Sequence, residues 1–255
     1  MTVFGEYSRY YQLLYQEKDY PAEAAYVLQL IRAHCPSTQS LLELGCGTGA
    51  HAQHFAEREI RVHGIDCSAQ MLEQARNRQK CLPEKVAERL TFSEGDVRQV
   101  RMADTYDAVI SLFHVASYQT DNEDLRNMFL TARKHLKPGG VFVFDCWYGP
   151  AVLRNLPAVR IKRMEDHAIE VKRIAEPVMH FDRNVVDVNY TVCIRDKADD
   201  SVIELKEVHV MRYLFSPEVE LFAGMAGMEI VDSRSWLSGN IPSVDSWNVC
   251  FTARA

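Results

Sequence analysis

Residues 41 to 49, Leu-Leu-Glu-Leu-Gly-Cys-Gly-Thr-Gly, constrain the fold of this chain more than any other stretch. A short apolar run leads to three glycines at alternate positions, and a helical pattern follows, which predicts a strand, a loop and a helix. Glycine accepts positive φ and carries no Cβ, so a ligand can lie against the main chain of such a loop. The first N–H groups of the following helix would point toward that ligand.

Acidic residues follow the next two predicted strands. Ile60 to Ile65 reads as a strand that ends at Asp66, and Ser68 then caps a helix to about Gln79. A carboxylate at the end of a second parallel strand can accept from both hydroxyls of a ribose. A third strand, Leu90 to Ser93, leads to Asp96, which could accept from the exocyclic amine of adenine; a plain turn residue is the alternative. The pattern favours a nucleoside ligand.

The first 150 residues alternate strands and helices, which is typical of an α/β domain with a parallel sheet. The remaining elements expected there share apolar periodicity: helices at 22–34, 51–58 and 125–136, and strands at 40–44, 106–112 and 141–144. Lys137 to Gly140 reads as a helix stop and a turn. Ligands in open α/β sheets bind at the carboxyl ends of the strands, so residues 113–118 should face the reacting group.

The second half of the chain has a different pattern. Period-two runs at 168–174, 185–194 and 202–213 predict antiparallel strands, with turns at 182–184 and 197–200. A helix at 217–226 and two strands at 229–234 and 247–253 close the chain. We therefore expect a core with an N-terminal lid at 1–150, an antiparallel β insert at 151–215, and the last core elements at 216–255.

Composition excludes several classes of protein. The net charge of −6 and the absence of a basic run disfavour a nucleic-acid partner. No stretch approaches 18 consecutive apolar residues, and the N-terminus lacks the pattern of a secretory signal, so we expect no membrane association. Seven scattered cysteines without a Cys-x-x-Cys pair favour reduced thiols in the cytoplasm and no metal site.

Four motifs together resemble those of class I S-adenosylmethionine (SAM) dependent methyltransferases: 43–49, 64–68, Gly95-Asp96 and 135–140. The resemblance implies a Rossmann-like, seven-stranded mixed sheet whose last strand is antiparallel, with SAM as cofactor and S-adenosylhomocysteine (SAH) as product. The cofactor's methionine tail is zwitterionic, so an acid beside the loop is welcome. The residues expected to contact the cofactor are Tyr20, Glu43, Gly45, Cys46, Gly47, Gly49, Asp66, Cys67, Met71, Asp96, Val97 and Phe113.

A narrower resemblance extends into the N-terminus. Residues 11–15, 18–20, 23–25, 46–51 and Trp147-Tyr148 are similar to those of the N-methyltransferases of macrolide amino sugars, and the pattern also occurs in methyltransferases of bacterial surface-polysaccharide biosynthesis. That family has a tyrosine-rich lid and an antiparallel insert over the acceptor. Residues 113–118, Phe-His-Val-Ala-Ser-Tyr, depart from the smaller polar residues of that family, so the acceptor could differ.

His114 is the first candidate for a catalytic base, because it follows the fourth strand where a side chain can reach the methyl group; a structural histidine is the alternative. Tyr15 is a second candidate, as a hydroxyl that orients the acceptor. His135 is assigned to structure. The candidate acceptor contacts, each with a structural alternative, are Tyr11, Tyr118, Trp147, Tyr148, His209 and Arg212.

Other functions stay open at this point. An NAD-dependent oxidoreductase would use Gly-x-Gly-x-x-Gly, with Ala50 in the third glycine's place, but Gly49 fills a position that is free in that fingerprint. A non-catalytic SAM-binding module and a methyltransferase of another small polar metabolite fit the same motifs. A methyltransferase of RNA, DNA or protein is disfavoured by the acidic pI of about 5.9. The sequence leaves open N- or O-methylation, and whether the insert is a lid or a homodimer surface.

Overall fold

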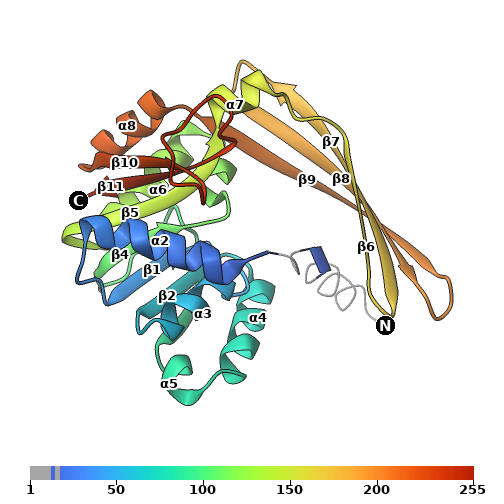
Figure 1. The fold of residues 1–255 in the computed structure, drawn as a ribbon, viewed down its shortest axis with the longest axis horizontal. Helices are drawn as coiled ribbons and strands as arrows, with labels where there is room; N and C mark the ends of the chain where they lie inside the picture. The colour runs from blue at the N-terminus through green and yellow to red at the C-terminus, as the bar shows by residue number, and fades with distance from the viewer. Residues whose placement is uncertain (1–12, 15–17) are drawn as a thin grey trace. The chain divides into compact units, whose positions relative to one another are not determined.

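The structure is a computed structural model that describes residues 13–14 and 18–255. It divides into two compact units (Figure 1). The core unit comprises Tyr20–Asn155 and Arg212–Ala255. The insert unit comprises Leu156–Met211 and the described residues before Tyr20. Among the described residues, no helix is long and apolar enough to cross a membrane.

A mixed sheet forms the centre of the core unit (Figure 1). Its parallel strands stand in the order β3 (Leu90–Glu94), β2 (Arg61–Asp66), β1 (Ser40–Leu44), β4 (Tyr106–Ser111) and β5 (Leu136–Tyr148). Next to β5 lies β11 (Asn248–Arg254), antiparallel to it, and β10 (Glu229–Ser235) is antiparallel to β11. The predicted α/β class, with a parallel sheet and a closing antiparallel pair, is confirmed.

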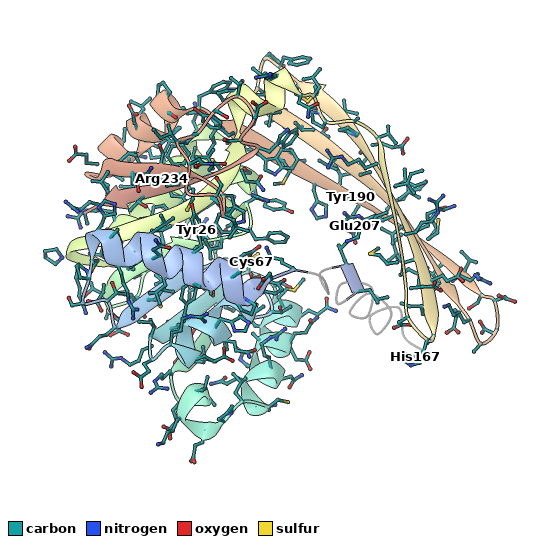
Figure 2. All side chains as sticks on the ribbon, viewed as in Figure 1. Tyr26, Cys67, His167, Tyr190, Glu207 and Arg234 are labelled. Atoms are coloured by element: carbon teal, nitrogen blue, oxygen red, sulfur yellow. The ribbon has the colours of Figure 1, made fainter. Side chains whose placement is uncertain are left out.

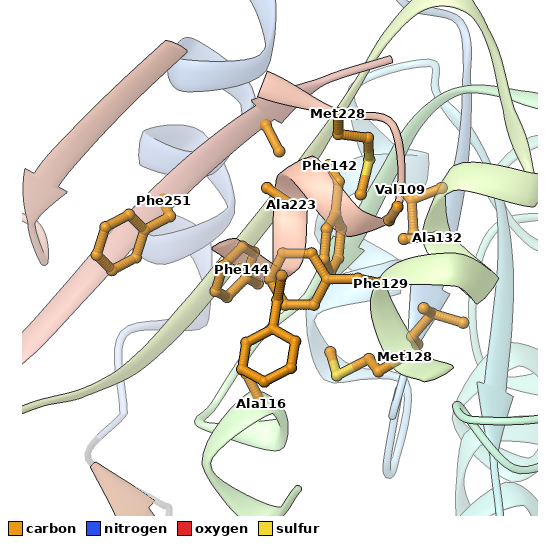
Figure 3. Close-up of a cluster of buried hydrophobic side chains, with 14 of the residues drawn as sticks. Val109, Ala116, Met128, Phe129, Ala132, Phe142, Phe144, Ala223, Met228 and Phe251 are labelled. Atoms are coloured by element: carbon orange, nitrogen blue, oxygen red, sulfur yellow. The ribbon is translucent and has the colours of Figure 1, made fainter. Parts of the chain in front are cut away.

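Helices cover both faces of this sheet. One apolar cluster joins it to α2 (Tyr20–His34), α3 (Ala50–Glu57) and α4 (Ala69–Lys80). The other joins it to α6 (Asn122–Lys134) and α8 (Ser216–Met225). In that second cluster, drawn in Figure 3, the ring centroid of Phe129 lies 5.2 Å from that of Phe144 at an edge-to-face angle. The short elements are α5 (Glu84–Ala87), the 3-10 turn η1 (Val115–Tyr118) and α7 (Gly149–Arg154).

The prediction of a helix stop and turn at Lys137 to Gly140 was wrong. Helix α6 ends at Lys134, and strand β5 begins at Leu136 and runs through both glycines, with Gly139 at φ +75°. His135, directly after the helix, has structural contacts through its side chain. Its buried ring bonds the Thr131 carbonyl through Nδ1 at 2.8 Å and accepts the Met102 N–H through Nε2 at 2.9 Å. The structural assignment of His135 is confirmed.

The insert unit is a sheet of long antiparallel strands. These are β6 (Arg160–Glu165), β7 (Ile169–His180), β8 (Val185–Asp196) and β9 (Val202–Leu214), whose last residues belong to the core unit. Three of them match the predicted strands. The fourth, β6, was not predicted because it alternates charged and half-buried residues without an apolar face. Within the unit, Leu14 packs in one apolar cluster with Ile169 and Val192.

Asp107 of β4 links the amino ends of strands β1, β4 and β5 through hydrogen bonds. Its Oδ2 accepts the N–H groups of Gln39 and Ser40 at 3.0 and 2.9 Å, and its Oδ1 lies 2.7 Å from Nζ of Lys137. Burial alone would raise the pKa of this carboxyl, but the hydrogen bonds from Lys137, Gln39 and Ser40 outweigh it and lower the pKa to about 2. The ionised form is therefore the one that stabilises the fold.

We expect Asp107→Ala to lower the free energy of unfolding by about 1–3 kcal/mol at pH 7, because two backbone N–H groups lose their acceptor. Since the folded pKa lies below the usual value near 4, the contribution is complete above pH 4 and is lost as the pH falls toward 2. Urea unfolding at pH 7 and pH 3 tests this, with the exposed Asp104→Ala as the matched control. Equal losses at both pH values would contradict the linkage.

Candidate active site

The glycine loop between β1 and α3 has the conformation that the sequence predicts. Gly45, Gly47 and Gly49 have φ values of +79°, +53° and +70°, a region that side chains other than glycine rarely adopt. A Cβ on Gly45 would lie 2.6 Å from a methyl carbon of Val115, and one on Gly49 would lie 2.8 Å from the Phe92 ring. A Cβ on Gly47 would meet no atom within 4 Å. The Gly47 side of the loop is thus open enough for a ligand to lie against the main chain.

Asp66, at the end of β2, is tied to this loop. Its Oδ2 accepts the Gly47 N–H at 2.8 Å, and its Oδ1 accepts the Ser68 N–H at 2.9 Å. Each carboxylate oxygen can take a further donor, so the side chain can still accept from two ribose hydroxyls. Ser68 caps α4 as predicted, with its Oγ accepting the N–H of Met71 at 3.2 Å.

Asp96, after β3, has a strong internal partner. Arg98 binds it through Nη2 at 2.6 Å and through Nε at 2.9 and 3.0 Å, and also reaches Asp124 at 2.8 Å. These hydrogen bonds from Arg98 hold the pKa of Asp96 below its usual value. The carboxylate is therefore ionised and fixed in place beside the carboxyl end of β3. A role as acceptor for an adenine amine stays a prediction.

Glu43, the acid that precedes the loop, is the most unusual group of this site. Its side chain is 1% exposed, and its Oε2 has no hydrogen-bond partner among the described residues. Burial, with a smaller contribution from the charge of Asp66, raises the pKa of this carboxyl to about 8. A buried oxygen without a donor is costly unless a ligand supplies one. The ammonium group of a zwitterionic amino-acid tail fits this requirement, so the residues present suit SAM.

The other predicted cofactor residues lie on α2, in the glycine loop and in the segments after β2 and β3. Tyr20 begins α2, and its ring meets the His51 ring edge-on with centroids 4.9 Å apart. Cys46 is buried within the glycine loop, whereas Cys67, labelled in Figure 2, is exposed just after β2. Val97 is partly buried against the core. All seven cysteines are free thiols.

His114 and Asp145 come together at the carboxyl ends of β4 and β5. Nδ1 of His114 lies 2.7 Å from Oδ2 of Asp145, and the His114 backbone N–H donates to the same carboxylate at 3.1 and 3.3 Å. The ring is not aligned for a directed hydrogen bond, so its attraction to Asp145 is electrostatic. Asp145 is 2% exposed and His114 19% exposed, so the carboxylate lies inside and the imidazole reaches solvent.

The backbone at this point is strained. Phe113 and His114 have φ values of +65° and +64°, in the left-handed region that a bulky residue adopts at a cost of about 1–3 kcal/mol. Consecutive residues of this kind persist where the surrounding structure holds them, here through Asp145 and the start of η1. Such strain is concentrated at functional sites. Phe113 was predicted to face the cofactor, and its ring lies 5.5 Å from that of His114.

Two aromatic candidates for acceptor binding lie near His114 in the core unit, and a third lies further along β5. The ring centroid of Trp147 is 6.4 Å from that of His114 and 5.6 Å from that of Trp247. Tyr118 is 46% exposed, whereas Tyr148 packs against the core with its hydroxyl 3.4 Å from Ser216. Tyr118 and Trp147 are thus the better placed of the three for an acceptor, and that role stays a prediction.

Arg212 has a place inside the core unit. It is 6% exposed and binds Glu218, the amide oxygen of Asn122 and the carbonyl of Thr120, with its guanidinium over the Phe222 ring. These contacts account for most of its donors and favour the structural alternative over the predicted contact with the acceptor. His209 lies on the insert unit, where its ring meets Tyr190 of β8 edge-on at 5.1 Å (Tyr190 is labelled in Figure 2). Tyr11 and Tyr15 lie outside the described residues.

The sequence reasoning missed Asp145, Glu23 and His51 as site residues. Asp145 directly follows the apolar run of β5, so its position at a carboxyl strand end was a usable signal. Glu23 and His51 lie 28 positions apart, and their contact at 2.7 Å depends on how α2 packs on α3.

Comparison with known proteins assigns the family. A methyltransferase-domain family matches residues 41–140. A dTDP-3-amino-3,4,6-trideoxy-alpha-D-glucopyranose N,N-dimethyltransferase of Streptomyces venezuelae is 30% identical over 223 residues, which are 86% of this chain and 89% of that protein. A dTDP-4-amino-2,3,4,6-tetradeoxy-D-glucose N,N-dimethyltransferase of Saccharopolyspora spinosa is 31% identical over 74% of each chain.

Solved structures agree with the fold. The crystal structure of DesVI of Streptomyces venezuelae has a TM-score of 0.78 and 28% identity, and covers 97% of this chain and 95% of that one. The SAM-bound structure of CalS10, an amino pentose methyltransferase from Micromonospora echinaspora, has a TM-score of 0.76 and 26% identity over 100% and 97% of the two chains. The glycine loop, the acid after β2 and these relatives together show that the chain belongs to the SAM-dependent methyltransferases, in the family of the dTDP-amino-sugar N,N-dimethyltransferases.

Proposed function

We propose that this enzyme methylates the amino nitrogen of a nucleotide-linked amino sugar. Three curated relatives that match 74–89% of the chain are named as N,N-dimethyltransferases of dTDP-linked amino sugars. The net charge of −6 also suits a small-molecule acceptor better than a nucleic acid. The sequence alone left N- and O-methylation open, and these relatives favour nitrogen.

The pairing of His114 with Asp145 is the observation that carries the proposal. An amine near neutral pH carries a proton on its nitrogen, and that proton must leave before the lone pair can attack. The imidazole has Asp145 beside Nδ1, and its Nε2 makes no hydrogen bond or ion pair with the described residues. That nitrogen is therefore available to take the acceptor's proton, while the buried carboxylate favours the imidazolium that forms. Such proton transfer contributes about 10²–10⁴ to a rate.

SAM supplies a methyl group that is already activated on a sulfonium. The remaining task of the protein is to hold the nitrogen in line with the C–S bond, which is worth about 7–11 kcal/mol for a well-oriented pair. Trp147 and Tyr118 of the core unit, which flank the His114 segment, are our candidates for holding the sugar. The carbon–nitrogen bond forms as the carbon–sulfur bond breaks, and SAH leaves. Two alternative roles stay open for the insert unit: a cover over the acceptor, or a homodimer surface.

A matched pair of acceptors tests the proposal. The full chain is incubated with SAM and either a dTDP-linked amino sugar or the same dTDP-sugar with a hydroxyl in place of the amine, and products are identified by mass spectrometry. We expect one or two methyl groups on the amine and none on the hydroxyl compound. Methylation of the hydroxyl compound would overturn the acceptor assignment. The assignment would also be overturned if neither compound were methylated while label from SAM entered another metabolite fraction.

A further inference from the structure

A buried cluster of two acids and one imidazole lies behind the glycine loop. Nε2 of His51 lies 2.7 Å from Oε2 of Glu23, and its Nδ1 lies 3.9 Å from Oε1 of Glu43. All three side chains are 8% exposed or less. Glu23 comes from α2, His51 from α3 and Glu43 from β1, so the cluster joins the three elements that frame the loop. Among the described residues, no such group is arranged to hold a metal ion.

Oε2 is the oxygen of Glu43 that is buried without a hydrogen-bond partner among the described residues. The imidazole of His51 stands beside the other oxygen, Oε1. Glu43 is followed within two positions by Gly45, the first residue of the open loop. A donor that lies along the loop can therefore meet Oε2, and that donor is the missing partner.

Burial and the charge of Asp66 oppose the ionisation of Glu43 in the absence of a ligand. The groups that face it are Asp66 on β2, Cys46 in the loop, Tyr20 on α2 and the cluster's own His51 and Glu23. Burial keeps two of them neutral: it raises the pKa of Tyr20 to about 12 and the pKa of Cys46 well above its usual value. Burial, then the charge of Asp66, raises the pKa of Glu43 to about 8, so the protonated form of this carboxyl is favoured at pH 7.

We propose that cofactor binding is coupled to the ionisation of Glu43, and that His51 is the positioning residue for this step. The α-ammonium group of the cofactor replaces the proton on Glu43. That proton leaves to solvent, and the ammonium keeps its own protons. Glu23 fixes His51 from the other side, so that the imidazole stays beside Oε1 and can carry positive charge between two carboxylates. This coupling concerns the cofactor and is independent of which acceptor is methylated.

Calorimetry of SAH binding to the full chain measures the proton directly. SAH carries the same ammonium group and is not consumed, so no acceptor or turnover is needed. Titrations at pH 7 in phosphate and in Tris, which differ in ionisation enthalpy, should show a net release of protons when SAH binds, with one proton per SAH as the upper limit. The affinity should rise with pH between pH 6 and 7, by at most about tenfold per pH unit for one released proton. Methylthioadenosine, which has the nucleoside but no ammonium, should release none.

Two variants test whether Glu43 and His51 are responsible for the coupling between cofactor binding and proton release. Glu43→Gln has no proton to release, so we expect proton release near zero and an affinity that no longer changes between pH 6 and 7. His51→Gln replaces the imidazole beside Oε1 by an amide that cannot carry positive charge, so we expect the midpoint of the affinity curve to move to higher pH. His54→Gln is the matched control, because His54 lies one turn further on α3 and its ring pairs with the surface residue Glu57.

The two parts of the proposal fail separately. Binding of SAH by the wild-type chain without proton release at pH 7 would overturn the coupling. An unchanged midpoint in His51→Gln, with the circular dichroism and melting temperature of the wild type, would overturn the role of His51 and leave the coupling standing. Neither result bears on the acceptor assignment, which the paired dTDP-sugars test independently.

Discussion

Replacement of His114 by alanine is expected to lower kcat by about 10²–10⁴ while the Kd of SAM stays within about threefold of wild type. The imidazole is the group that we assign to take the acceptor's proton, and Asp145 holds it at 2.7 Å. The described contacts of the cofactor loop to Asp66 do not involve His114. The loss should therefore fall on the chemical step. Single-turnover rates with a dTDP-amino sugar, beside SAM binding by calorimetry, measure both quantities.

Asp145→Asn provides the second half of this test. The amide keeps a similar shape and can still accept the His114 N–H, but it no longer stabilises an imidazolium. A loss of kcat smaller than that of His114→Ala, with SAM affinity again retained, would support the assigned roles. His54→Ala, which removes a surface imidazole paired with Glu57, serves as the control and should leave kcat unchanged. A His114→Ala enzyme with wild-type kcat would remove His114 from proton transfer.

Local signals in the sequence were enough to predict the elements of the cofactor site. The glycine loop, the end of β2 at Asp66 and the cap at Ser68 each depend on residues within a few positions of one another. Such patterns report backbone conformation, which neighbouring residues largely determine. The parallel order followed from the alternation of strands and helices, and the closing antiparallel pair from the family resemblance.

The sequence alone did not predict the contacts between distant segments of the chain. The pairing of Asp145 with His114 requires the register of β4 against β5, in which Ser111 stands opposite Phe144. The cluster of Glu23 with His51 requires the packing of α2 on α3. Arg212 could equally have been an exposed strand residue or a ligand contact until Glu218 and Asn122 were seen to bind it. Side-chain roles of this kind depend on burial, which one sequence does not report.

The Lys-Pro-Gly-Gly segment shows how a correct local signal can receive a wrong assignment. Glycine and proline after a helical pattern usually mark a helix end. Here the chain already leaves the helix at His135, whose ring bonds both Thr131 and Met102. Gly139 then lies at an irregular point within strand β5, with φ +75°. The glycine and proline do mark an irregular point of the chain, but that point lies within strand β5 and not at the end of helix α6.

Asp66→Ala is expected to weaken SAM binding by about 10²–10⁴, the largest effect on cofactor affinity that the structure predicts. Two charge-assisted hydrogen bonds to the ribose, each worth about 1.5–3 kcal/mol, would be lost together. The substitution also frees the Gly47 N–H, which Asp66 accepts at 2.8 Å, so the loop loses its link to β2. Calorimetry with SAH, with no acceptor present, measures this affinity.

Asp107→Ala is the control that distinguishes loss of the ribose contact from a general loss of stability of the sheet. Asp107 accepts two backbone N–H groups as Asp66 does, but it does so at the amino ends of the strands, opposite the loop. Its loss should lower the stability of the fold and leave SAH affinity near wild type. If both variants weakened SAH to the same degree, the effect would come from a loosened sheet. If Asp66→Ala bound SAH as well as wild type, the ribose contact would be wrong, and the carboxylate would serve only to hold the loop.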